Sequence, residues 1–210
     1  MSKVINFSMD WQYVRVKIEG TAPLIMNKFP EETKDDMLNK HLGNKGSVRK
    51  AKDLDKAFNN AIHYLSDGKT PGFVARAFKS CMYEGWARHK SKDLAMKDIV
   101  RFVRIVPTEQ ETNMVKIHGV PKIRIDIKTN ANGSPDTRIR AEFPVWSAEF
   151  EIQFLKFSPQ QIVTAINEGG FVCGIGDERP NSRQSKTGSF GTFKVVYAEE
   201  VVQNYKEVVG

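Results

Sequence analysis

A glycine-rich, basic stretch in the last quarter of the chain carries the residue types best suited to holding an anion. It consists of Gly174-Ile175-Gly176-Asp177-Glu178-Arg179 and, after a short spacer, Gly188-Ser189-Phe190-Gly191. Glycines let a backbone approach a ligand closely, and successive backbone N–H groups form concavities that bind anions. Because Arg179, Arg183 and Lys186 add positive charge, the stretch predicts a phosphate site. A solvated, flexible loop is the alternative interpretation of the same composition.

Acid–base or metal-assisted chemistry has fewer candidates. Histidines can serve it, and the chain offers His41, His63, His89 and His118, besides the carboxylates Asp35 and Asp36 considered with the resemblance given below. None has a second partner at a spacing that certifies a catalytic arrangement, and the two aspartates also suit the charged start of a helix. The sequence therefore favours a binding protein over an enzyme. If it is an enzyme, Asp35, Asp36 and His41 are the catalytic candidates.

The charge of the chain is positive and regional. Lys and Arg number 32 against 25 Asp and Glu, a net charge of +7, which makes polyanions the first partner class to consider. The segment 76–104 has eight basic against three acidic residues, and 116–140 has six against two. Two alternating stretches, around Arg15 and Lys17 and around Lys122 and Arg124, combine charge with the pattern of a strand face. Such faces suit contact with a nucleic-acid backbone, or are simply solvated.

Length and composition indicate one elaborated globular domain over residues 1–210, since 40% of the residues are hydrophobic. There is no apolar run of about 18–20 residues, and residues 1–10 lack a basic leader, so neither membrane insertion nor secretion is expected. Cys81 and Cys173 are too few for a disulfide framework and lack the spacing of a zinc site. We expect a reducing cytoplasm, no metal and no cofactor.

Hydrophobic periodicity predicts an α+β fold. The expected strands are 13–20, 99–106, 122–128, 138–143, 146–154 and 193–198, and the expected helices lie in 31–65, 73–86 and 159–168. Gly169-Gly170 is expected to end the last helix. A helical insertion (30–69) and a long β-hairpin (107–145) interrupt the order, and the glycine-rich loop spans 171–191. Without these insertions the order is β-α-β-β-α-β, that of a ferredoxin-like (RRM-like) core.

In that order, the motifs G-I-G-D-E-R and G-S-F-G resemble the glycine-rich loop of the RAMP superfamily, the RNA-binding proteins of CRISPR effector complexes. Glu19-Gly20-Thr21-Ala22-Pro23-Leu24 looks like the G-x-x-P-L exit of that superfamily's first strand. Thr70-Pro71-Gly72, leading into Ala75 to Lys79, is similar to the opening of the first helix in the repeating backbone subunits. The hairpin resembles their projecting thumb. The chain also resembles uncharacterised bacteriophage proteins of this length.

The resemblance implies sequence-tolerant binding of a single nucleic-acid strand, RNA in the first place, through its phosphate backbone. It implies a homo-oligomer or filament stacked head to tail along the strand, with other phage or CRISPR-type subunits as further partners and no membrane. The location would be the cytoplasm, that of the host if the protein is phage-encoded. The residues expected to contact nucleic acid are Arg15, Lys17, Lys79, Lys122, Arg124, Arg138, Arg140, Gly174, Gly176, Arg179, Arg183, Lys186, Gly188 and Gly191.

Three alternatives stay open at this point. Some RAMP proteins cut RNA with a histidine or with an aspartate that recruits a metal, so a metal-dependent or histidine-dependent endoribonuclease is one. A phage protein for single-stranded DNA binding or recombination is another, because phosphate contacts do not distinguish the sugars. The third is a protein-binding platform directed against host defence.

Overall fold

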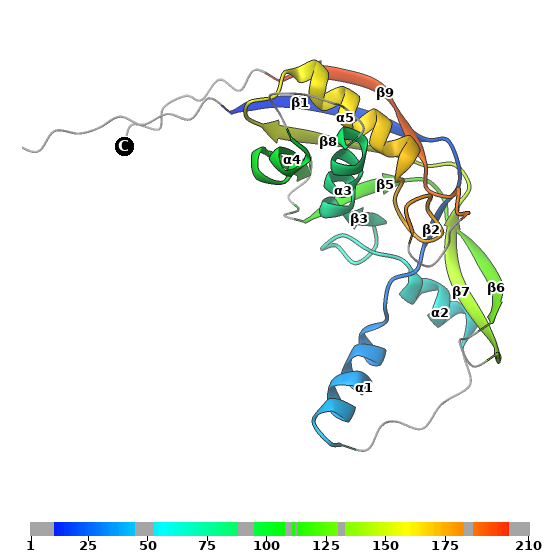
Figure 1. The fold of residues 1–210 in the computed structure, drawn as a ribbon. Helices are drawn as coiled ribbons and strands as arrows, with labels where there is room; N and C mark the ends of the chain where they lie inside the picture. Colours follow the sequence, from blue (N-terminus) through cyan, green and yellow to red (C-terminus); the bar gives the residue numbers. More distant parts are fainter. Residues whose placement is uncertain are drawn as a thin grey trace, which may run out of the picture.

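The structure is a computed structural model whose described residues form an α+β fold of two antiparallel sheets and five helices (Figure 1). The residues it describes are 11–44, 53–87, 95–107, 111, 113–129, 133–182 and 187–201. None of the helices among these residues is long and apolar enough to cross a membrane.

The larger sheet forms the body of the protein. Its strands, in spatial order, are β3 (Gly72–Val74), β5 (Met114–His118), β8 (Ser147–Phe154), β1 (Gln12–Gly20) and β9 (Phe193–Glu200), and β4 (Val103–Pro107) also pairs with β8. All of these pairings are antiparallel. The alternation predicted for β1 is confirmed, since Val14, Val16 and Ile18 are buried. Every second side chain of β1 and β8 thus enters the core.

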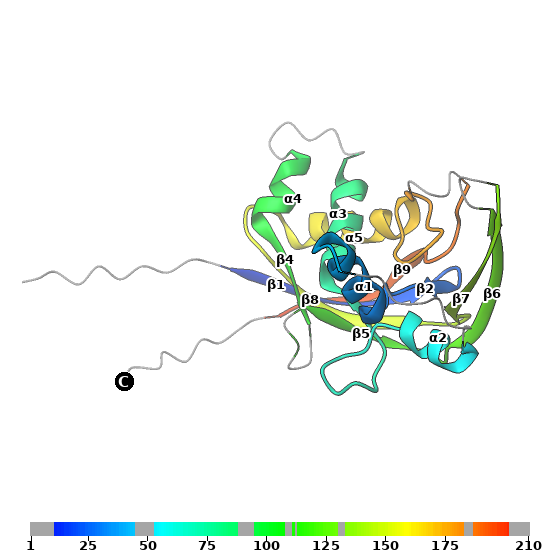
Figure 2. The ribbon, with the colours of Figure 1, turned by 90° about the horizontal axis from the view of Figure 1, so that it is seen from below.

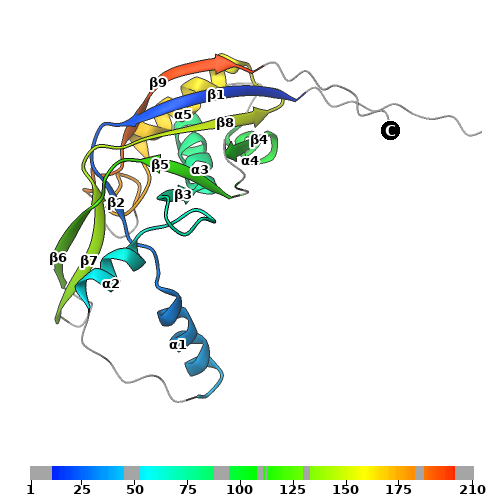
Figure 3. The same cartoon turned by 180° about the vertical axis from the view of Figure 1, so that it is seen from behind.

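Three helices cover one face of this sheet (Figures 1 and 3): α3 (Ala75–Trp86), α4 (Met96–Phe102) and α5 (Pro159–Val172). The side chain of Ser158 accepts a hydrogen bond from the Gln161 N–H at 3.2 Å, and this cap fixes the start of α5. Four aromatic residues predicted as core are buried between sheet and helices: Phe78, Trp86, Trp146 and Phe150.

The prediction that Gly169-Gly170 ends the last helix is wrong, because α5 continues to Val172. Both glycines instead allow close packing inside the helix. A Cβ on Gly169 would overlap the backbone of Cys81 in α3, and a Cβ on Gly170 would overlap Phe193 in β9. The pair therefore sets how closely α5 approaches its neighbours.

The strand predicted over 99–106 is half wrong, because α4 occupies Met96–Phe102 and only Val103–Pro107 is a strand. The Asp98 side chain accepts a hydrogen bond from the Ala95 N–H at 2.7 Å, and this cap begins the helix, with Ile99 buried beneath it.

The short strands β2 (Leu24–Met26), β3 and β5 were not predicted. β5 lies within the predicted hairpin segment 107–145, yet it belongs to the larger sheet.

The smaller sheet has the order β2, β7 (Pro135–Phe143), β6 (Lys122–Thr129), and its β6–β7 pair is the predicted hairpin. It projects from one end of the body, with α2 (Leu54–Ala61) alongside β7 (Figure 2). The helix α1 (Glu31–His41) stands away from both sheets and has no buried residue (Figures 1 and 3). Both helices of the predicted insertion 30–69 are present. The boundaries of the insertion, the hairpin and the glycine-rich loop stay predictions.

Candidate nucleic-acid interface

A cleft of about 740 Å³ lies between the first three turns of α3 and the glycine-rich loop that follows α5. Arg76, Ala77, Ser80 and Glu84 line it from the helix, and residues 173–177, 179, 181 and 182 line it from the loop. The two walls are held together by the tight contact between α3 and α5, where a Cβ on Gly85 would overlap the backbone of α5. The cleft is therefore a fixed feature of the fold.

Hydrogen bonds anchor the glycine-rich loop to the segment that contains β2. The Asp177 N–H donates to the Ile25 carbonyl at 2.9 Å, and the Gly191 N–H donates to the Pro23 carbonyl at 2.8 Å. Gly191 has φ +66°, and a Cβ on it would overlap the Ile175 carbonyl oxygen. Only glycine fits at such a position.

The predicted glycines are thus needed for the packing of the loop itself. A Cβ on Gly174, Gly176 or Gly188 would likewise meet backbone atoms of this chain within 2.8 Å. Close approach of a ligand backbone to these glycines stays a prediction.

Two arginines supply the positive charge of the cleft. The Arg76 side chain is exposed and forms no ion pair among the described residues. Arg179 donates from Nη1 to the Gly176 carbonyl oxygen at 2.9 Å, and within the described part of the chain no carboxylate pairs with it. Within the described ranges, no direct ion pair therefore cancels either guanidinium charge. Arg183 and Lys186, also predicted as contacts, lie outside the described residues.

One thiol, that of Cys173, lines the cleft, and the neighbouring Cys81 thiol does not. Cys81 is buried and donates from Sγ to the Gly174 carbonyl oxygen at 3.0 Å, and burial raises the pKa of its thiol. The neighbouring Cys81 thiol, together with the positive charge of Arg179, lowers the pKa of the Cys173 thiol. Both cysteines are free.

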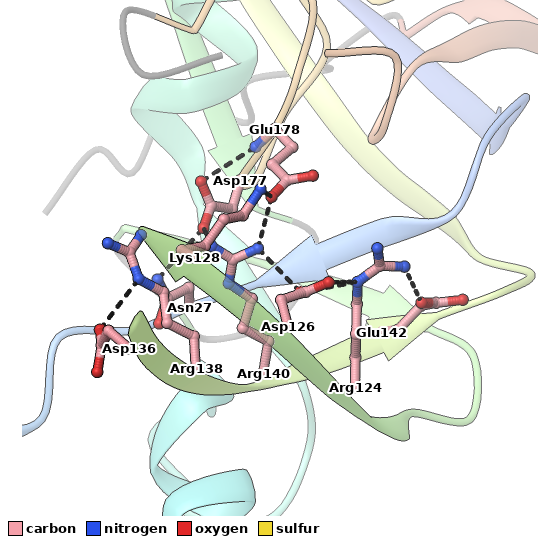
Figure 4. Close-up of polar contacts among 10 residues, drawn as sticks. All are labelled: Asn27, Arg124, Asp126, Lys128, Asp136, Arg138, Arg140, Glu142, Asp177 and Glu178. Atoms are coloured by element: carbon pink, nitrogen blue, oxygen red, sulfur yellow. Dashed lines mark hydrogen bonds and ion pairs between the residues drawn. The ribbon is translucent and has the colours of Figure 1, made fainter. Parts of the chain in front are cut away.

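A buried ion network joins the loop to the hairpin (Figure 4). The Arg140 side chain in β7 is 1% exposed, and its Nη1 lies 3.1 Å from Asp126 Oδ2 and 2.8 Å from Glu178 Oε1. Its Nη2 lies 3.1 Å from Asp177 Oδ2. Lys128 Nζ also pairs with Glu178 at 2.6 Å. Burial alone would raise the pKa of Glu178, but the hydrogen bonds from Lys128 and Arg140 outweigh it and lower that pKa.

Arg140 therefore ties two acidic residues of the loop to one of β6. Its charge is neutralised inside the protein, and its buried Nε has no hydrogen-bond partner among the described residues. Breaking a buried pair by removing one partner costs far more than losing an exposed pair. The arrangement fixes the loop against the hairpin and leaves the Arg140 guanidinium out of reach of a ligand in this conformation.

The other cations of the hairpin differ in how far they are neutralised. Arg124 pairs with Asp126 at 2.9 Å and with Glu142 at 2.7 Å, and these hydrogen bonds raise its pKa. Its guanidinium also stacks on the Phe190 ring of the glycine-rich loop, 4.9 Å from the centroid. Arg138 pairs more loosely with Asp136 at 3.4 Å. Lys122 is exposed and has no ion pair among the described residues.

The predicted strand face around Arg15 and Lys17 is balanced by carboxylates. No described helix covers this face of the larger sheet (Figure 3). Arg15 pairs with Glu151 at 2.8 Å and with Glu199 at 3.1 Å, and Lys17 lies opposite Glu149 in the register of β8. Three glutamates next to two cations make this face a poor attractor of phosphates compared with the cleft.

The remaining candidates lie away from the cleft. Lys79 donates from Nζ to the Val100 carbonyl oxygen at 2.8 Å and so holds α4 against α3. Asp35 and His41 lie exposed and Asp36 half-buried on α1, which stands apart from the glycine-rich loop (Figures 1 and 3). Over the described ranges, no group of three His, Cys, Asp or Glu side chains is placed to hold a metal ion.

Sequence reasoning missed Arg76 as a lining residue of the cleft and missed the acidic partners of Arg140. Helical spacing gave a signal for the first, because Arg76, Ser80 and Glu84 recur every four residues on one side of α3. No signal pairs Asp177 and Glu178 with Arg140, since 37 or more residues separate them.

No protein-family model matches this chain, and no curated protein matches it. Similar solved structures include a type III-B Cmr-beta complex bound to cognate target RNA, at 13% identity and a TM-score of 0.43, covering 91% of this chain. This chain spans only 61% of that neighbour's length. Cmr6 from Pyrococcus furiosus is 9% identical over 90% of this chain and all of that one, with a TM-score of 0.41. A CRISPR RNA-guided surveillance complex is 10% identical over 93% and 71%, with a TM-score of 0.36.

Proposed function

We propose that this protein binds single-stranded RNA without sequence preference, with the phosphate backbone in the cleft between α3 and the glycine-rich loop. The observation that carries the proposal is the pair of guanidinium groups in the cleft, Arg76 and Arg179, neither of which pairs with a carboxylate among the described residues. Guanidinium groups bind phosphates in a bidentate geometry. Arg183 and Lys186 follow Arg179 closely in the chain and extend the same positive region.

Lys122, Arg138 and Arg124 are the proposed contacts on the hairpin, in order of decreasing availability. Lys122 is unpaired among the described residues, Arg138 has one loose ion pair, and Arg124 has two close ones. Arg140 is omitted from the interface because its side chain is buried among three carboxylates. We assign it the role of a positioning residue that holds the loop.

The proposal includes a ferredoxin-like core and assembly of copies. The order β9-β1-β8-β4, with α3 and α5 on one face, supports the β-α-β-β-α-β interpretation. The G-I-G-D-E-R and G-S-F-G motifs support a RAMP-type subunit, and we propose that copies assemble head to tail along one strand, with other phage or CRISPR-type subunits as further partners. Two free cysteines suit a reducing cytoplasm, the proposed location.

The test is a fluorescence-anisotropy titration with single-stranded RNA, single-stranded DNA of the same sequence and duplex, over a range of salt concentrations. The double variant Arg76→Ala/Arg179→Ala should weaken RNA binding for every sequence. It should also flatten the plot of log K against log salt by about 0.7 for each lost phosphate contact. Equal binding to DNA would make single-stranded DNA the substrate and favour the recombination alternative.

The matched control is Arg15→Ala/Lys17→Ala, which removes the same charge from the sheet face. Because those cations face glutamates, we expect a salt slope close to that of the wild type. An unchanged slope in the Arg76/Arg179 variant would remove the cleft from the interface. A flattened slope in the control would place the strand on the open sheet face instead.

A further inference from the structure

The two cysteines of the chain lie beside each other where α3 packs against α5. The helices touch at Gly169, since a Cβ on that residue would overlap the backbone of Cys81. Cys173 follows Gly169 by four residues, and its N–H donates to the Gly169 carbonyl oxygen at 2.9 Å. Residues four apart lie on the same side of a helix, so Cys173 also faces α3. The Cys81 thiol in turn donates to the carbonyl oxygen of Gly174, the next residue after Cys173, at 3.0 Å.

The two thiols differ in their access to solvent. Cys173 lines the cleft together with Arg179, whereas Cys81 lies behind it with no exposed surface. Cys173 is only 4% exposed, but the cleft of about 740 Å³ leads to it and is wide enough for a molecule the size of hydrogen peroxide. Cys173 is therefore the outer thiol of the pair and Cys81 the inner one.

The groups around the outer thiol favour the thiolate, which is the nucleophilic form. The neighbouring Cys81 thiol and the Arg179 guanidinium lower the pKa of the Cys173 thiol to about 7, and the Asn181 side chain acts in the same direction. Burial and the Glu84 carboxylate oppose this change but are outweighed. Burial raises the pKa of the Cys81 thiol, which therefore stays protonated. The thiolate thus forms on the side that faces the cleft.

We propose that Cys173 and Cys81 form a peroxide-sensitive redox pair in the wall of the cleft. The Cys173 thiolate attacks one oxygen of hydrogen peroxide, the O–O bond breaks, and hydroxide leaves, which gives a sulfenic acid. The Cys81 sulfur then attacks the Cys173 sulfur, an S–S bond forms, and the sulfenic oxygen leaves as water with the thiol proton. The two sulfurs lose two electrons and the peroxide gains them. No step needs a nucleic acid, so the pair is independent of the ligand of the cleft.

The experiment is mass spectrometry of the full chain after treatment with hydrogen peroxide, without nucleic acid. The wild type should lose two hydrogen atoms, and peptide mapping should find Cys81 linked to Cys173. Cys81→Ser should stop at the sulfenic acid, which dimedone labels at Cys173. Cys173→Ser should form neither the link nor the dimedone adduct.

Alkylation by iodoacetamide compares the two thiols in the folded protein. Cys173 should react at least about tenfold faster than Cys81 at pH 7, because each unit between two thiol pKa values changes the thiolate fraction about tenfold. The rate at Cys173 should rise as pH increases through about 7. Arg179→Ala should move that rise to higher pH. Arg15→Ala is the matched control and should leave it unchanged, because Arg15 pairs with Glu151 on the open face of the larger sheet.

Three results would overturn the inference. Equal alkylation rates for the two cysteines would show that the cleft does not activate Cys173. A wild type that stops at the sulfenic acid would show that Cys81 does not reach it, and a disulfide between two copies would replace the pair by an intermolecular link. RNA added before iodoacetamide separates this inference from the proposed function, because a disulfide that still forms without RNA, together with alkylation that RNA does not slow, refutes only RNA binding in the cleft.

Discussion

Replacing Arg140 by methionine tests the network that joins the glycine-rich loop to the hairpin. The substitution keeps an apolar stem but removes the guanidinium from Asp126, Asp177 and Glu178, which lie 2.8 to 3.1 Å from it. Breaking a buried ion pair from one side costs about 3–5 kcal/mol. The three carboxylate side chains are 14–18% exposed, and two of them keep a second cation.

Because these carboxylates keep other partners, the expected loss of stability lies at the lower end of the range of about 3–5 kcal/mol. Lys128 stays 2.6 Å from Glu178, Arg124 stays 2.9 Å from Asp126, and Asn27 still donates to Asp177 at 3.2 Å. We therefore expect the free energy of unfolding to fall by about 3 kcal/mol. For a protein of this size that corresponds to a decrease in Tm of about 6–12 °C.

Urea denaturation followed by circular dichroism measures the change, and Arg138→Met is the matched control. Arg138 lies two residues away on the same strand, is 35% exposed and has one carboxylate at 3.4 Å, so its loss should cost less than about 1 kcal/mol. Equal losses in the two variants would refute the argument that burial makes Arg140 special.

RNA binding then separates positioning from direct contact. If Arg140 holds the loop, Arg140→Met should weaken binding at temperatures where it is folded, with the salt slope unchanged. If the guanidinium touched a phosphate, the slope would fall by about 0.7. Arg140→Lys keeps the charge but lacks the planar fork, so it should restore little of the stability.

Three further outcomes follow from the same geometry. Because the folded pKa of Glu178 is lowered, its contribution is present above its unfolded value of about 4.3 and is lost as pH falls through the folded pKa. The stability difference between wild type and Glu178→Gln should therefore narrow in acid-titrated urea melts. Gly191→Ala should cost at least about 1–3 kcal/mol by the same melts, because the strain of its positive φ adds to the overlap of a Cβ with the Ile175 carbonyl oxygen. Labelled RNA should stay intact with and without Mg²⁺. Cleavage products would establish the endoribonuclease alternative, and Asp35, Asp36 and His41 would then be the first residues to replace.

Periodicity was sufficient where one element has one buried face. Apolar residues alternate in β1 and β8 and recur with helical spacing in α3, and both patterns indicate which side faces the core. These three elements were therefore predicted close to their observed bounds. α4 was taken for a strand because β-branched residues dominate Ile99 to Val106, whereas a cap from Asp98 decides the helix locally. β2 and β3 are three residues long, too short to show any period.

The candidate site was harder to predict, because a sequence gives the charge of each residue separately. In the fold, side chains from distant segments neutralise one another. Arg138 and Arg140 have the same residue type, strand and side of that strand, yet one is partly exposed and the other is buried. The difference comes from Asp177 and Glu178 of the glycine-rich loop, which form ion pairs with Arg140. A count of basic residues could not distinguish a free cation from one already paired.

The network around Arg140 also links RNA binding to the proposed head-to-tail assembly of copies. The network around Arg140 fixes the hairpin against the loop that lines the cleft, and the hairpin carries Lys122, Arg138 and Arg124, the proposed contacts outside the cleft. The position of a bound strand and the position of the neighbouring copy would then depend on the same three carboxylates. Loosening the network should therefore disturb the spacing of assembled copies as well as the affinity for RNA, even though Arg140 contacts neither. An Arg140→Met protein that binds RNA weakly but assembles with unchanged spacing in electron micrographs would show that the loop and the hairpin act independently.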